Sequence, residues 1–105
     1  MMDNTEITIQ ELKKWRPDEY HLVDVRDEMS YSYGQLPGAE HVPEQQILDG
    51  WVPEDDGKKT VLYCKKGETS LEAAGFLEGK GYTVYSLQGG YLAWRMSIVE
   101  EEAEK

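Results

Sequence analysis

The stretch of sequence that decides the fold is TVLYCKKGETSLEAA, which occupies residues 60–74. Its first four residues form a short apolar and β-branched run that is typical of a buried strand, and this run leads directly into Cys64. After a tight loop, Thr69 is followed three residues later by Glu72, the spacing of a capping box at the start of a helix. The stretch therefore predicts a strand, a loop and a helix, with Cys64 at the end of the strand.

The helix predicted after this loop has an apolar face. Leu71, Ala74 and Leu77 recur at helical spacing, and we expect them to be buried together. The Gly79-Lys80-Gly81 segment then ends the helix, as glycine-rich C-caps commonly do.

Outside this stretch, strands and helices are predicted to alternate along the chain. Residues 6–15 predict a short strand and a helical turn capped by Thr8 and Glu11, while further strands are expected at 21–25, 40–42 and 83–87. Helices are expected at 28–33 and 91–97, residues 43–59 are expected to be the least regular part, and 100–105 to fray. This alternation over short loops predicts an α/β fold with a parallel sheet. In such sheets ligands bind at the carboxyl ends of the strands, which is where Cys64 is placed.

Composition limits the classes of function. The 105 residues fit one domain, and the net charge of −10 argues against partners that need a basic face, namely nucleic acid and anionic membranes. The apolar runs are only a few residues long, too short to span a bilayer. Residues 1–6 include two acids and no basic segment, so we expect no secretory signal and predict a cytoplasmic protein.

The cysteine count restricts the chemistry further. Cys64 is the single cysteine, so it cannot form an intramolecular disulfide, and the spacing of His21 and His41 does not suit a zinc site. We therefore expect neither a metal nor an organic cofactor. Taken alone, a single cysteine is more often a small buried hydrophobic residue than a reactive group.

The position of Cys64 before a helix favours the reactive alternative. The first amides of a helix lack internal partners, and a tight loop before them supplies further N–H groups next to the positive end of the helix dipole. Such surroundings favour a thiolate over a thiol and also favour an anionic substrate. Gly67 would allow a positive φ in the loop, Lys65 and Lys66 would attract an oxyanion, and Glu68 is expected to face solvent.

Four motifs in this order resemble the rhodanese-like family of sulfurtransferases. The loop that opens with Cys64 resembles the family's six-residue active-site loop, and LVDVR at 22–26 resembles its leading strand motif. YGQLPGA at 33–39 is similar to the family's Gly-His-Ile-Pro-Gly-Ala turn, with Gln35 where histidine is usual, and LQGGYLAW at 87–94 is similar to its C-terminal motif. The resemblance covers residues 5–97, which are expected to form one rhodanese domain followed by an acidic tail at 98–105.

This resemblance implies a fold and a reaction. The expected fold is a central parallel sheet of about five strands with helices on both faces. The expected reaction takes sulfane sulfur from a donor such as thiosulfate onto Cys64 as a persulfide and passes it to cyanide or a thiol. The substrate-binding residues implied are those that follow the cysteine, namely Lys65, Lys66, Gly67, Glu68, Thr69 and Ser70.

The sequence leaves one question open, the choice between an enzyme and a persulfide carrier, and favours one answer to two others. The chain could turn over small donors as an enzyme, or it could carry persulfide to a partner protein with little small-molecule turnover. Phosphatase or arsenate-reductase chemistry would need a longer loop with arginine six positions after the cysteine, where this chain has Ser70. For Asp24 and Arg26 we favour a structural ion pair or loop hydrogen bonds near the site over a catalytic role.

Overall fold

A five-stranded parallel sheet forms the centre of the protein. The computed structural model describes residues 6–103, and its strands lie in the order β1-β5-β4-β2-β3 with every pairing parallel. The strands are β1 (Glu6–Ile7), β2 (Tyr20–Asp24), β3 (Glu40–His41), β4 (Lys59–Tyr63) and β5 (Tyr85–Leu87). The predicted α/β class and parallel sheet are confirmed, with strand ends shifted by one or two residues.

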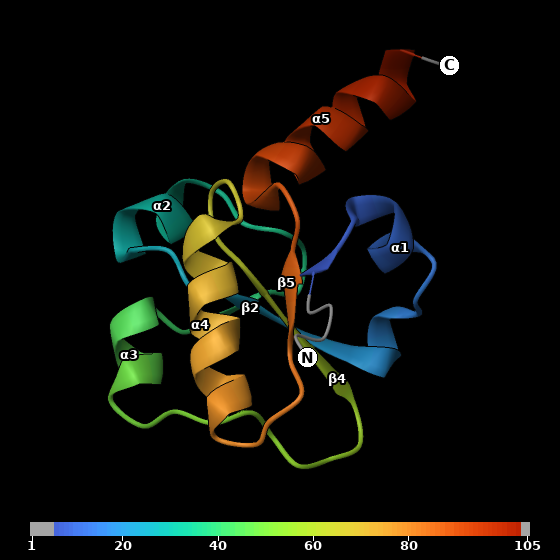
Figure 1. The fold of residues 1–105 in the computed structure, drawn as a ribbon. Coiled ribbons are helices and arrows are strands. Elements are labelled where there is room, and N and C mark those ends of the chain that lie inside the picture. Colours follow the sequence, from blue (N-terminus) through green and yellow to red (C-terminus); the bar gives the residue numbers. More distant parts are fainter. Residues whose placement is uncertain (1–5, 104–105) are drawn as a thin grey trace.

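Helices cover both faces of this sheet (Figure 1). They are α1 (Ile9–Lys13), α2 (Glu28–Tyr33), α3 (Glu44–Leu48), α4 (Glu68–Gly79) and α5 (Gly90–Ala103), with a 3₁₀ turn at Pro17–Glu19. Figure 1 shows α3 and α4 on one face and α1 and α5 on the other, with the end of α5 extending beyond the body of the protein. No helix among residues 6–103 is long and apolar enough to cross a membrane.

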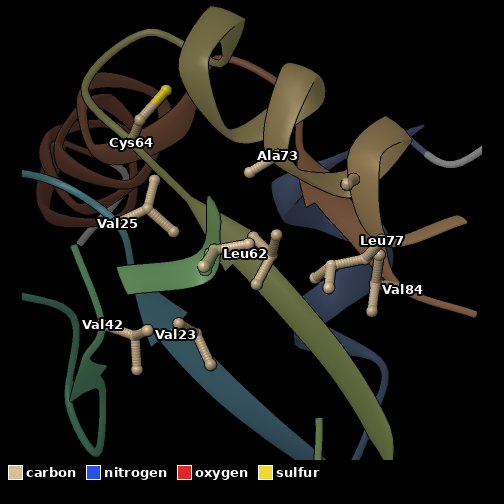
Figure 2. Packing of buried hydrophobic residues seen from close by; sticks show 10 residues of the cluster. Val23, Val25, Val42, Leu62, Cys64, Ala73, Leu77 and Val84 are labelled. Carbon is tan, nitrogen blue, oxygen red and sulfur yellow. The ribbon is translucent and has the colours of Figure 1, made fainter. Parts of the chain in front are cut away.

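Each face of the sheet has its own buried cluster. On the α4 face, Leu62 packs with residues of β2, α4 and the segment before β5, and Figure 2 shows this cluster with Cys64 at its upper edge. On the α1 face, Val61 and Tyr63 pack with residues of β1, α1 and β5. Successive residues of β4 point to opposite faces of the sheet, so the apolar run before Cys64 supplies both clusters.

Two predictions about secondary structure are wrong. The segment expected to be least regular contains α3, whose Ile47 is fully buried against the α4 face. The last helix does not end at residue 97 but continues through Ala103, so residues 98–103 are helical. Residue 5, the predicted start of the domain, and residues 104–105 of the predicted tail lie outside the described residues.

The start of α4 also differs from the prediction, whereas the capping box at Thr8 and Glu11 is present. Helix α4 begins at Glu68, with Gly67 as an N-cap that offers no side-chain hydrogen bond, so Thr69 and Glu72 form no capping box. Ala74 and Leu77 are buried as predicted, but Leu71 is not. The buried face of α4 consists of Ser70, Ala73, Ala74 and Leu77, while Leu71 is partly exposed.

Candidate active site

Cys64 lies where β4 ends, at the carboxyl edge of the sheet. Its side chain belongs to the buried cluster under α4 and is only 5% exposed. In Figure 2 the sulfur lies at the top of that cluster, beside the loop that leads into α4. The thiol thus has an apolar base and a polar upper side formed by the next residues, which we call the Cys64 loop (residues 64–70).

The Cys64 loop directs hydrogen-bond donors at the sulfur. The backbone N–H of Gly67 lies 3.1 Å from Sγ, and that of Ser70 lies 3.3 Å away. The Ser70 hydroxyl oxygen is 3.5 Å from Sγ and accepts a hydrogen bond from the thiol. Because these amides lie at the start of α4, the positive end of a 12-residue helix also faces the sulfur. The two backbone N–H groups and the helix end would stabilise negative charge on the sulfur, whether in a thiolate or in a persulfide.

Gly67 has the conformation that the sequence predicted. Its φ is +110°, a region that L-residues with side chains rarely adopt. A Cβ at this position would lie 3.0 Å from the backbone nitrogen of Gly89. The glycine is therefore needed both for the backbone angle and for the contact with the turn before α5.

The first residues of α5, directly after that turn, support the Cys64 loop from behind. The N–H of Tyr91 donates to the carbonyl of Cys64 at 2.8 Å, and the N–H of Leu92 donates to the carbonyl of Lys65 at 3.1 Å. A Cβ on Gly90 would overlap the Cys64 carbonyl and lie 2.8 Å from that of Lys65. The sequence did not reveal this supporting role, because its only signal was the motif at 87–94, which by itself predicts no more than a turn and a helix.

An open cavity of about 420 Å³ leads to the sulfur. It is lined by Val25, Arg26, Asp27, Ser30, Pro43, Glu44, Cys64, Lys65 and Thr69. A smaller hollow of about 170 Å³ adjoins it and is lined by Cys64, Lys65, Lys66, Glu68 and Thr69. The wall formed by Asp27, Ser30, Pro43 and Glu44 comes from the segments after β2 and β3, and no signal in the sequence predicted it.

The charges around the cavity are not distributed evenly. Asp27 and Glu44 line the cavity from the segments after β2 and β3, and a hydrogen bond from the Ser30 backbone lowers the pKa of Asp27, which keeps it ionised. Lys65 and Lys66 are exposed on the loop side, and Glu68 is exposed there as predicted. An anion therefore meets attractive charge on the side of the two lysines.

Asp24 and Arg26 form an ion pair beside the cavity. Asp24 is fully buried, and Arg26 donates to it from Nη2 at 2.7 Å and from the backbone N–H at 2.9 Å. Arg26 also donates to the carbonyl of Gly34, and its guanidinium lies 4.4 Å from the ring centre of Tyr91. Although Arg26 lines the cavity, its donors are largely occupied by other groups of the protein.

Tyr63 completes this buried arrangement from β4. Its hydroxyl donates to Asp24 at 2.6 Å and accepts from the N–H of Leu36 at 3.0 Å. Burial, together with the hydrogen bond to the Asp24 carboxylate, raises the pKa of Tyr63 well above its ordinary value. The phenol therefore stays protonated and acts as a fixed donor to Asp24.

Neither histidine lines the cavity or the hollow beside Cys64. His41 makes a hydrogen bond of 2.7 Å with the Arg26 carbonyl and stacks on Tyr31. His21 lies at the amino end of β2, opposite to the edge that carries Cys64, and its Nε2 is 2.6 Å from Asp56. His21 and Asp56, with Glu54, form the one group among residues 6–103 whose donor atoms are close enough to hold a metal ion. The direct hydrogen bond between His21 and Asp56, which lowers the pKa of Asp56, is remote from the sulfur.

Comparison with known proteins identifies the family. A model described as "Rhodanese-like domain" matches residues 8–97. The chain belongs to the rhodanese-like family. It is 30% identical over 105 residues to the protein named thiosulfate sulfurtransferase GlpE of Ectopseudomonas mendocina (strain ymp), covering 99% of this chain and 96% of that protein. It is 36% identical over 81 residues to the protein of the same name from Pseudomonas fluorescens (strain SBW25), covering 76% and 74% of the two chains.

A solved structure shows the same fold. The rhodanese-related protein of Thermoplasma volcanium superposes with a TM-score of 0.79 at 25% identity, covering 88% of this chain and 91% of that one. The predicted rhodanese-like α/β fold, with a five-stranded parallel sheet between helices, is confirmed by this likeness and by the strand order.

The residues predicted for the site occupy three kinds of position. Gly67 and Ser70 contact the sulfur of Cys64. The loop side chains line the cavity or the hollow beside it, namely Lys65, Lys66, Glu68 and Thr69. Asp24 lines neither of these spaces, and its contact with the site passes through Arg26.

Proposed function

We propose that this rhodanese-like protein is a thiosulfate sulfurtransferase in which Cys64 carries the transferred sulfur as a persulfide. The observation that carries the proposal is the pair of backbone N–H groups aimed at the sulfur of the single cysteine, at the start of a helix and at the end of an open cavity. Such a site stabilises negative charge on sulfur before and after transfer. The names of the relatives, and the match to the family over residues 8–97, support the same activity.

In the first half-reaction, the Cys64 thiolate attacks the outer sulfur of thiosulfate. A bond forms between Sγ and that sulfur, the sulfur–sulfur bond of thiosulfate breaks, and its electron pair leaves with sulfite. The products are the Cys64 persulfide anion and sulfite, so that the total charge of −3 is conserved. We propose that Lys65 and Lys66 attract the dianionic donor, because both are exposed beside the hollow next to the sulfur.

In the second half-reaction, an external nucleophile attacks the outer sulfur of the persulfide. Cyanide leaves as thiocyanate and a thiolate leaves as a persulfide, while the electron pair of the broken bond returns to Sγ. Because the chain has no second cysteine, the persulfide cannot collapse into an intramolecular disulfide. The sulfur therefore leaves only to an acceptor from outside.

The physiological acceptor is a small thiol, cyanide or a protein thiol. The alternative activity, a persulfide carrier with little turnover on small donors, uses the same sulfur site. A cyanide-dependent rate with thiosulfate would favour the enzyme, and loading of Cys64 without such turnover would favour the carrier.

Three further predictions stay predictions. They are a location in the cytoplasm, the assignment of residues 5–97 as the domain, and the roles of the individual site residues.

The experiment that tests the proposal is the intact mass of the protein after incubation with thiosulfate. We expect the mass of one additional sulfur atom, retained after the donor is removed by gel filtration and lost when cyanide is added. The control is Cys64→Ser, which should unfold like the native protein but gain no mass. A native protein that gains no sulfur, or a Cys64→Ser variant that gains it equally, would overturn the proposal.

A further inference from the structure

Ser86 places a hydroxyl group in the middle of the sheet, where an apolar residue would be expected. It lies in β5, it is fully buried, and its strand partners are Leu62 of β4 and Glu6 of β1. Its Oγ is 2.7 Å from the Oγ of Ser70, on the buried face of α4. A buried hydroxyl costs free energy unless it forms a hydrogen bond, so the pairing of these two serines requires an explanation.

The direction of this hydrogen bond follows from the partners of each serine. Among residues 6–103, the Ser86 hydroxyl has no hydrogen-bond partner other than Ser70. The Ser70 hydroxyl has two others, because it lies 3.4 Å from the carbonyl of Gly67 and 3.5 Å from Sγ of Cys64. If Ser70 donated to Ser86, the Ser86 proton would be buried without an acceptor, which costs about 1–3 kcal/mol. Ser86 is therefore the donor, and the Ser70 proton is free for another acceptor.

The free proton of Ser70 has a different acceptor in each state of the sulfur. When Cys64 is a thiol, it donates to Ser70 Oγ, and the Ser70 proton is left for the carbonyl of Gly67. When Cys64 becomes an anion, it no longer donates and instead becomes the stronger acceptor. A rotation of the Ser70 hydroxyl then adds a third donor to the backbone N–H groups of Gly67 and Ser70. In both states Ser70 Oγ accepts the hydrogen bond from Ser86.

We propose that Ser86 is a positioning residue for sulfur transfer: by donating to Ser70, it keeps the Ser70 hydroxyl available to the sulfur anion of Cys64. Ser86 does not contact the sulfur and lines neither the cavity nor the hollow beside it. It therefore acts on the stability of the sulfur anion and not on the binding of the donor. As a statement about sulfur transfer, this inference rests on the proposed function.

The test uses two pairs of proteins that differ in the hydroxyl. Native protein is compared with Ser86→Ala, and Ser86→Thr is compared with Ser86→Val. Thr and Val occupy nearly the same volume, so any effect of the added methyl group on packing cancels within that pair. Thermal unfolding of all four proteins shows whether each one is folded at the temperature of the assay.

The first readout is the single-turnover rate of sulfur loading as a function of thiosulfate concentration. We expect the maximal rate to fall about threefold to tenfold in Ser86→Ala, and by a similar factor from Ser86→Thr to Ser86→Val, the size of effect that the loss of one neutral hydrogen bond supports. The concentration for half-maximal rate should stay unchanged. Equal maximal rates within each pair, or a change only in the half-maximal concentration, would overturn the proposal.

The second readout does not depend on sulfur transfer. The rate of alkylation of Cys64 by iodoacetamide at constant pH reports how readily the sulfur anion forms, and we expect it to fall in Ser86→Ala and in Ser86→Val relative to their hydroxyl-bearing partners. Should the native protein take up no sulfur from thiosulfate, the proposed function fails, yet the order of alkylation rates still tests Ser86. Equal alkylation rates within each pair would show that Ser86 is only structural.

Discussion

Two loops at the carboxyl edge of the sheet follow similar strands but differ in the partners of their hydrogen-bonding groups. The segment after β2 and the Cys64 loop after β4 both follow buried strands that lie side by side, with Asp24 paired in register with Tyr63. Both carry basic side chains next to the cavity, Arg26 in one and Lys65 in the other. Judged only by its position after a buried strand and its basic residue, either loop would be a candidate binding site.

The difference lies in which hydrogen-bonding groups already have partners. After β2, the Arg26 guanidinium is bonded to Asp24 and Gly34 and lies against Tyr91. In the Cys64 loop, two amides point at a sulfur, and the basic side chains extend into solvent. Groups that already have protein partners fix geometry, whereas groups aimed at a reactive atom or at solvent remain available to a substrate.

The largest effect is expected where the Cys64 loop rests on the start of α5. In Gly90→Ala the new Cβ would overlap the carbonyl of Cys64, so the loop must move away from its position on that helix. Displacement of a reacting group by about 1 Å can reduce rates by about 100-fold, and we expect a loss of that order in sulfur loading. Single-turnover loading with thiosulfate measures it.

The matched control for this change is Gly57→Ala. Gly57 also has a positive φ, +82°, but a Cβ there would meet no atom within 4 Å. The control therefore introduces comparable backbone strain without the overlap, and it should leave sulfur loading unaffected. If the two variants lost equal activity, support of the Cys64 loop by the start of α5 would not be the cause.

A smaller effect on sulfur transfer is expected from the positive charge of the Cys64 loop. Replacing both Lys65 and Lys66 by Gln removes the exposed positive charge beside the sulfur, and we expect the KM for thiosulfate to rise about tenfold, or ~1.4 kcal/mol. The steady-state assay with cyanide measures KM, and added salt should narrow the difference between variant and native protein.

The chain offers a control with the same change in charge. Lys58 and Lys59 are exposed at the amino end of β4, opposite to Cys64, so their replacement by Gln lowers the net charge equally but far from the sulfur. KM should change little in that variant. A similar rise in both double variants would mean that overall charge, and not the Cys64 loop, attracts the donor.

The smallest effect on activity is expected from Tyr63, whose hydroxyl donates to Asp24 at the end of β2. Tyr63→Phe removes the hydrogen bonds to Asp24 and Leu36, so the free energy of unfolding should fall by about 1–3 kcal/mol while sulfur loading changes less than about twofold. Denaturant unfolding and single-turnover loading measure the two effects. A loss of activity without a loss of stability would instead give Tyr63 a role in the reaction.

The pH dependence of this stability has a definite sign. The pKa of Tyr63 in the folded protein lies above the value of 10.0 for a free tyrosine side chain, so folding favours the protonated phenol. Its contribution is complete below pH 10 and is lost as the pH rises above 10, because the unfolded chain ionises first. The difference in unfolding free energy between native protein and Tyr63→Phe should therefore shrink above that pH.

Local patterns in the sequence predicted much of the fold and the centre of the site. The apolar runs before Asp24 and Cys64 predicted two buried strands, and Gly67 predicted a positive φ, because each signal depends on neighbours in the chain. The prediction of a capping box at Thr69 was wrong because it also used only a local pattern. Thr69 and Glu72 have the required spacing, but α4 begins at Glu68 with Gly67 as its N-cap. The Ser70 amide, in the first turn of α4, lies against the sulfur.

Contacts between distant segments were decided by the tertiary structure alone. The sequence by itself determined the class of fold and the position of Cys64 at a strand end, since periodicity and turn residues are properties of short segments. It could not show that Gly90 lies against the Cys64 carbonyl or that Ser86 reaches Ser70 from 16 residues away. Those contacts exist because β5 pairs with β4 in a particular parallel register, which brings the turn before α5 and a buried hydroxyl beside the Cys64 loop. The register depends on how both faces of the sheet are packed, and no single segment encodes it.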